Sequence, residues 1–264
     1  MVETKEKKET KPASAKTTKG KEEKEDVKKA KKVSKKETDF KIDTDKMLEA
    51  GVHFGHRTSR LHPKVEPYLA GIKNTIHIID LEKTAKKLEE ALKFIQELIS
   101  ENKALLLVGT KIQIKNLVKE IAEECTLPYV NERWLGGTLT NFEVLSKRVE
   151  YLKEIEKKKA SGEWEKYTKK ERIKMDRELQ NMKTKFEGLK KLERIPAAIF
   201  VLDIRKDDLA VKEARMKGVK IIAICDTNVD PTLVDYPIPG NDDAISSVKY
   251  ILEKVKETIL KIKK

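Results

Sequence analysis

Short apolar runs alternate with amphipathic stretches through most of the chain after residue 75. The runs expected to be strands are 76–79, 104–108, 128–130, 197–202 and 221–225, and helical periodicity is expected over 81–100, 111–124, 207–217 and 242–261. An unbroken apolar run such as 104–108 is typical of a strand that is buried on both faces. Strands and helices that alternate with short connections predict an α/β fold built on a doubly wound, parallel sheet.

Residues 142–192 interrupt this alternation. Leu145, Val149 and Leu152 repeat at helical seam spacing, and so do later apolar residues, which are Met175, Leu179, Met182, Phe186 and Leu189. Thr168 and Glu171 fit a capping box for the second helix. The pattern predicts an antiparallel coiled-coil helical hairpin over 142–192, inserted into a sheet domain that comprises 41–141 and 193–264. Such a hairpin either only stabilises the domain or contacts another macromolecule. Its net charge of +6 favours contact.

Positive charge is concentrated outside the expected sheet. Of the net charge of +13, residues 1–39 contribute +5 from 14 lysines and 9 acidic residues. Residues 1–40 contain few apolar side chains, which predicts a disordered tail that either only solvates the chain or lies along a phosphate backbone. A basic chain favours a polyanionic partner, either nucleic acid or an acidic membrane surface.

Several classes of protein are not expected. No apolar run reaches the roughly 18 residues that would span a membrane, and the N-terminus lacks the apolar core of a signal peptide. The two cysteines, Cys125 and Cys225, lie in or beside apolar segments, which favours a reducing, cytoplasmic location over a disulfide scaffold.

Polar residues follow the expected strands, and in a parallel sheet these positions gather at one edge. They are Asp80, Gly109-Thr110-Lys111, Asn131-Glu132-Arg133, Asp203 and Asp226. Gly109-Thr110-Lys111 is like part of a phosphate loop, but the first glycine of that motif is missing at the required spacing. We therefore interpret it as a strand-to-helix turn. A nucleotide- or metal-dependent enzyme that uses these loops is the alternative function.

One group of titratable residues suggests a metal site. His56, Asp226, Asp242 and Asp243 are expected near the same sheet edge, where they could hold a single divalent ion, zinc or magnesium. The alternative is that the histidine orders its loop, while Asp242 and Asp243 cap the last helix. No cofactor is expected to be required.

The segment 134–141, WLGGTLTN, joins an aromatic residue to a Gly-Gly turn before the hairpin. We favour an internal anchor that fixes the direction of the hairpin. Contact of Trp134 or Arg133 with RNA is the alternative.

Taken together, several segments resemble the bacterial ribosomal protein S2 family. They are AGVHFGHRTSRLHPKVEPYLAGIKNTIHIIDLEKT at 50–84, LLLVGTK at 105–111, NERWLGGTLTNF at 131–142, IPAAIFVLDIRKDDLAVKEA at 195–214 and ICDTNVDPTLVDYPIPGNDDAI at 224–245. The resemblance covers about 44–262 and does not extend to the tail.

The resemblance implies a flavodoxin-like sheet domain with a coiled-coil hairpin and no enzymatic activity. It also implies binding to small-subunit ribosomal RNA and to other ribosomal proteins, including the mRNA-binding protein S1. RNA is then expected to be bound through phosphate and shape contacts. The candidate phosphate contacts are Arg57, Arg60, Lys64, Lys73, Arg133, Lys147 and Arg148.

Overall fold

The structure is a computed structural model that describes residue 40 and residues 42–263. The chain divides into two units, Met1–Lys41 and Ile42–Lys264. The tail predicted over 1–40 therefore lies outside the described residues, except for Phe40. No helix in the described part is both long and apolar enough to cross a membrane.

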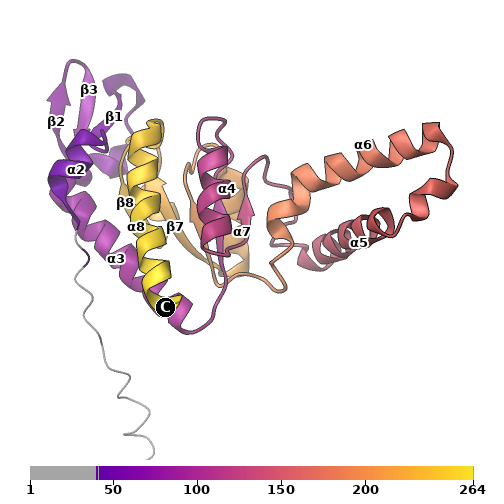
Figure 1. Cartoon of the computed structure of the whole chain (residues 1–264). Helices are drawn as coiled ribbons and strands as arrows, with labels where there is room; N and C mark the ends of the chain where they lie inside the picture. The colour runs from indigo at the N-terminus through magenta and orange to yellow at the C-terminus, as the bar shows by residue number, and fades with distance from the viewer. Residues whose placement is uncertain (1–39, 41, 264) are drawn as a thin grey trace, which may run out of the picture. The chain divides into compact units, whose positions relative to one another are not determined.

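Five parallel strands form the main sheet of the second unit (Figure 1). They are β4 (Leu105–Val108), β5 (Tyr129–Val130), β6 (Ala198–Val201), β7 (Lys220–Cys225) and β8 (Tyr236–Pro239). Their spatial order is β5-β4-β6-β7-β8. When these strands are counted along the chain, the order is 2-1-3-4-5, which is the flavodoxin-like arrangement. The predicted parallel α/β sheet is confirmed.

The strand predicted at 76–79 forms, but the prediction that it belongs to the parallel sheet is wrong. It is β3 (Ile76–Ile79), the central strand of a small antiparallel sheet with β1 (Phe54–Arg57) and β2 (Leu69–Lys73). A two-residue turn, Asn74 and Thr75, joins β2 to β3, and both residues have positive φ, 49° and 62°. Such a turn forces antiparallel pairing, because parallel strands need a long crossover.

Strand β8 was not predicted, because its sequence, YPIP, contains two prolines. Pro237 and Pro239 pair with Ala223 and Cys225 of β7. Proline has no N–H for the ladder and is tolerated on edge strands. Because β8 is the last strand in the order, its prolines face no further strand.

Helices cover both faces of the parallel sheet. Contacts link α3 (Leu81–Ser100) and α4 (Lys115–Glu124) to α8 (Ile245–Lys263), and the three lie side by side in front of the sheet in Figure 1. On the opposite face, α7 (Asp208–Lys217) packs on β6 and β7. Helices α4 and α8 start at Lys115 and Ile245, later than the predicted residues 111 and 242, because turns precede them.

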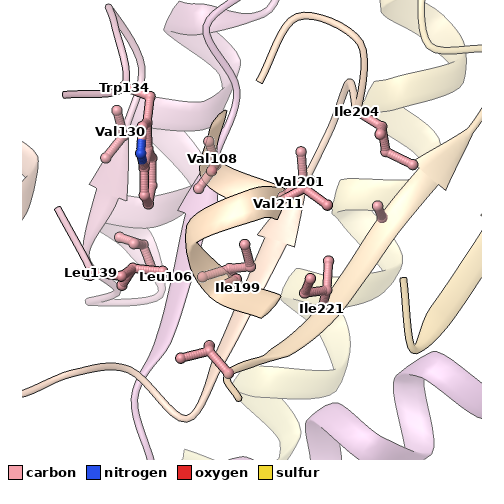
Figure 2. Close-up of a cluster of buried hydrophobic side chains, with 14 of the residues drawn as sticks. Leu106, Val108, Val130, Trp134, Leu139, Ile199, Val201, Ile204, Val211 and Ile221 are labelled. Atoms are coloured by element: carbon pink, nitrogen blue, oxygen red, sulfur yellow. The ribbon is translucent and has the colours of Figure 1, made fainter. Parts of the chain in front are cut away.

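The core on the α7 face joins the sheet to the segment that precedes the hairpin. Leu106, Val108, Ile199 and Val201 belong to the same buried cluster as Trp134, as Figure 2 shows. Every residue of β4 and β6 is at most 1% exposed, so burial on both faces is confirmed for these runs.

Two helices form where the inserted hairpin was predicted. Helix α5 (Phe142–Ala160) and helix α6 (Lys169–Phe186) are joined through the 3-10 turn Glu163–Lys166 and share a buried cluster of Leu152, Trp164 and Leu179. The predicted capping box of Thr168 and Glu171 is confirmed. Coiled-coil packing and the domain limits at 141 and 193 stay predictions. The base of the pair belongs to the core of the sheet, through Leu145, Val149, Leu189 and Leu192.

The short elements complete the chain. They are α2 (Thr44–Glu49) and the 3-10 turns Thr58–Arg60, Pro63–Tyr68, Glu187–Leu189 and Pro231–Leu233.

Candidate functional site

Lys111 is the centre of a charge cluster at the carboxyl ends of the strands. Its Nζ lies 2.9 Å from Asp203 Oδ2, 2.9 Å from Asp242 Oδ1 and 2.8 Å from Asp243 Oδ1. It also donates a hydrogen bond to the backbone oxygen of Asp242, at 3.0 Å. Lys111 follows β4 and Asp203 follows β6, so this contact bridges the point where the strand order reverses. In sheets of this kind that point is the usual ligand site.

Burial shifts the pKa values of the residues in this cluster. It raises the pKa of Asp242 to about 7. Repulsion from Asp203 and Asp226 adds to this rise, and the charge of Lys111 opposes it. Burial alone would lower the pKa of Lys111, but the hydrogen bond to Asp243 and the charges of the other carboxylates raise it above its ordinary value. Lys111 therefore stays charged. Its charge compensates these carboxylates and is not free to bind a phosphate group.

A second contact lies at the same strand ends. The Thr110 hydroxyl donates to Asp207 Oδ1 at 2.8 Å, and the Thr110 N–H donates to Asp207 Oδ2 at 3.3 Å. Burial raises the pKa of Asp207 to about 6. Because Thr110 and Lys111 both bind carboxylates of the chain itself, this arrangement supports a strand-to-helix turn and not a phosphate loop.

Two of the three aspartates predicted to surround a metal with His56 lie against its ring. His56 Nδ1 is 3.0 Å from Asp226 Oδ2, and His56 Nε2 is 3.5 Å from Asp243 Oδ2. The hydrogen bond to Asp226 raises the pKa of His56, against the effect of burial. Asp242 binds Lys111, and its charge also raises the pKa of His56. Among the described residues, no group of three or more histidine, cysteine, aspartate or glutamate side chains is placed to hold a metal ion.

Hydrogen bonds join the His56 segment to the end of β7. The N–H of His56 donates to Thr227 Oγ1 at 2.9 Å, and the N–H of His62 donates to Thr227 O at 2.8 Å. Asn228 Nδ2 lies 3.0 Å from His56 Nε2. This set of contacts connects positions more than 160 residues apart and needs no ion.

Gly55 is required for this close approach. A Cβ at Gly55 would lie 2.5 Å from Thr227 Cγ2 and 3.1 Å from the backbone oxygen of His77. We expect Gly55→Ala to lower the free energy of unfolding by about 1–3 kcal/mol, because the segment must move away from Thr227. Gly71→Ala is the matched control, since a Cβ there meets nothing within 4 Å. Urea unfolding measures both, and equal losses in the two variants would contradict the explanation.

The candidate phosphate contacts fall into two groups. Lys64 and Lys147 are already paired, with Asp230 at 2.7 Å and Glu143 at 3.0 Å. The other candidates are exposed and take part in no ion pair among the described residues; they are Arg57, Arg60, Lys73, Arg133 and Arg148.

Two of the exposed candidates lie together. Arg57 and Arg60 line a cavity of about 440 Å³ that also contains His56 and Asp226. Arg133 is separate from them and lines another cavity, beside Lys115.

Two basic residues near these cavities were missed. Arg205 lines a cavity with Arg60, and the next residue, Lys206, lines the cavity of Arg133. Both are exposed and follow the end of β6. Their position two and three residues after Asp203, at an expected strand end, is the signal that could have identified them.

Glu213 is a buried carboxylate that holds the segment before the hairpin. Its oxygens accept hydrogen bonds from the N–H groups of Gly137 at 2.8 Å, Leu139 at 3.0 Å and Thr140 at 3.1 Å, and from Trp134 Nε1 at 3.3 Å. Burial alone would raise the pKa of Glu213, but these donors lower it. With Trp134 only 5% exposed, the geometry supports the internal anchor. Sequence reasoning missed Glu213, although a charged residue on the apolar side of the helix expected at 207–217 was the available signal.

Comparisons with known proteins identify relatives of this chain. A family model described as ribosomal protein S2 matches residues 47–261. Two curated relatives, from Dictyoglomus thermophilum and Dictyoglomus turgidum, are both named small ribosomal subunit protein uS2. Each is 48% identical to this chain over 215 residues, which cover 81% of this chain and 87% of the relative. The chain therefore belongs to the ribosomal protein S2 family.

Proposed function

We propose that this protein is a structural, non-enzymatic component of the small ribosomal subunit, where it binds ribosomal RNA and neighbouring ribosomal proteins. Membership of the ribosomal protein S2 family carries this proposal. The geometry supports it, because Lys111 and Thr110, at the strand ends where such a sheet usually binds a ligand, are engaged by Asp203 and Asp207 of the chain itself. We place the protein in the cytoplasm, as part of the ribosome.

The RNA contact is proposed at the carboxyl edge of the sheet. We call the exposed residues Arg57, Arg60, Arg133, Arg205 and Lys206 the basic edge. None of them takes part in an ion pair within the described residues, so their charges are available to phosphate groups. Lys64 and Lys147 are weaker candidates, because each would first have to leave a carboxylate partner.

Charge reversal on the basic edge tests this assignment. We expect Arg57→Glu with Arg60→Glu to weaken binding of small-subunit RNA by about tenfold or more, and to reduce the dependence of log affinity on log salt by about two. The matched control is Lys249→Glu with Lys261→Glu on exposed positions of α8, which changes the net charge equally. Filter binding at several salt concentrations measures both. Equal weakening by the two pairs would show a general charge effect and remove the assignment.

The hairpin is proposed as a second contact. Arg148 is exposed on α5, and exposed apolar side chains on the two helices are Val144, Tyr151 and Ile173. This mixture of cationic and apolar surface suits a ribonucleoprotein neighbourhood. The resemblance to the family makes ribosomal protein S1 the proposed protein partner.

A single divalent ion at His56 and Asp226 is also proposed. Asp226 and Asp243 both lie within 3.5 Å of His56, but Lys111 already compensates Asp242 and Asp243. About one equivalent of zinc or magnesium in protein purified without chelator would support the ion. Metal-free native protein would leave only the hydrogen bonds.

A further inference from the structure

A cavity of about 430 Å³ lies between the end of β4 and the end of β6. Its lining includes Ile112, Lys115, Arg133, Lys206 and Leu209, and we call it the switch-point cavity. It lies at the strand ends beside the strand-order reversal, and Lys111 is not among its lining residues. Its volume is within the range of sites that hold small ligands.

The switch-point cavity exposes apolar surface. Ile112 is 79% exposed, more than any other large apolar side chain in the part of the chain that the structure describes, and Leu209 is 42% exposed. Single exposed apolar side chains are ordinary. Two that line one cavity, at the ligand edge of the sheet, together offer a surface for a flat apolar group.

Positive charge in this cavity is only partly compensated. Lys115 pairs with Glu132 at 2.9 Å, whereas Arg133 and Lys206 take part in no ion pair among the described residues. Asp207 lies in the lining, but it is 2% exposed and accepts the Thr110 hydroxyl. The two free cations therefore favour an anionic group beside the apolar surface.

We propose that the switch-point cavity receives one unpaired nucleotide of ribosomal RNA, with the base against Ile112 and Leu209 and the phosphate on Arg133 and Lys206. This inference rests on the proposed function. Proteins that recognise RNA bind splayed-out bases of loops and bulges, and an arginine guanidinium can stack on a base.

Continuity with the basic edge favours RNA over an acidic peptide. Arg205 precedes Lys206 and lines the next cavity together with Arg60. Phosphates on one side of the inserted nucleotide would therefore meet further cations. A peptide with one acidic and one apolar side chain could bind in the cavity, but it would make no contact with the cations that lie beyond it.

Chemical probing of the RNA tests the inference on the full chain. Small-subunit RNA is bound to the wild type, to Ile112→Ser with Leu209→Ser, and to the control Met216→Ser, which changes an apolar side chain 77% exposed elsewhere on α7. Acylation of 2′-hydroxyl groups then reports each nucleotide. We expect a short unpaired run to be protected by the wild type and the control but reactive with the double variant, with the rest of the footprint retained. RNA affinity should fall by about tenfold.

Other outcomes overturn the inference in distinguishable ways. If the double variant keeps the complete footprint and the wild-type affinity, no nucleotide occupies the cavity. If the double variant keeps the complete RNA footprint and a neighbouring protein crosslinks at Arg133, the occupant of the cavity is a peptide. If the wild type itself leaves no footprint, the proposed function fails together with the inference. Arg133→Gln provides an independent variant, for which the same short run should become reactive.

Discussion

Replacing Glu213 with alanine should lower the free energy of unfolding by about 4 kcal/mol. The substitution removes the acceptor for three backbone N–H groups and for the indole N–H of Trp134. Glu213 is 4% exposed and Trp134 is 5% exposed, so water replaces these bonds poorly. For a unit of this size the thermal midpoint should fall by about 10 °C.

Two further measurements separate this explanation from a general loss of stability. Amide exchange at Gly137, Leu139 and Thr140 should become faster than elsewhere in the sheet domain. Glu213→Gln, which keeps the shape but supplies one acceptor oxygen, should lose less stability than Glu213→Ala. Glu143→Ala, at an exposed position of α5, is the control and should change stability by less than about 1 kcal/mol. A Glu213→Ala protein as stable as this control would contradict the anchor.

Lys111→Met should be similarly destabilising, by about 3–5 kcal/mol near neutral pH. The variant leaves the buried carboxylates of Asp203 and Asp242 without their cation, and these residues are 5% and 3% exposed. Lys115→Met is the matched control. It removes a lysine from an exposed pair with Glu132, so it should cost less than about 1 kcal/mol.

The Lys111 variant should also depend on pH in a defined direction. In the wild type the pKa of Asp242 is already about 7, above its ordinary value of 3.8, so the folded state binds more protons than the unfolded state between these pH values. Stability from this group is present below pH 3.8 and is lost as pH rises through about 7. Without Lys111 the pKa of Asp242 rises further, so the deficit relative to the wild type should grow from about pH 7 to about pH 9. Urea unfolding across this range measures it, and a deficit that does not change with pH would argue against a buried carboxylate.

The fold of the sheet was largely predictable because local signals and packing agree. The run 104–108 and the run 197–202 form buried strands where continuous apolar sequence predicted them. The pairing of 76–79 was not predictable from its own residues, since three isoleucines and a histidine fit a parallel or an antiparallel sheet equally well. The turn at Asn74 and Thr75 decides it. Likewise, β8 forms because β7 offers it an edge, although its own prolines disfavour a strand.

The candidate site, like the fold, was predictable only in part, because some of its contacts depend on residues far apart in the sequence. His56 approaches Asp226 and Asp243 as expected, although it lies on β1 of the small antiparallel sheet and not in a strand-end loop of the parallel sheet. Sequence reasoning did not identify Lys111 as the cation that compensates the carboxylates around it. That assignment depends on the geometry of three separate strand ends. Glu213 was missed for the same reason, since its donors lie more than 70 residues away.

Sedimentation of the full chain is the most direct measurement of the central claim. An extract of cells that express the protein is run through a sucrose gradient at moderate salt, and the protein is followed with an antibody. A structural component of the ribosome should migrate with small subunits and with whole ribosomes, and it should leave them only when salt is raised strongly. A protein that runs free at the top of the gradient at moderate salt, while other small-subunit proteins migrate with the RNA, would contradict the account.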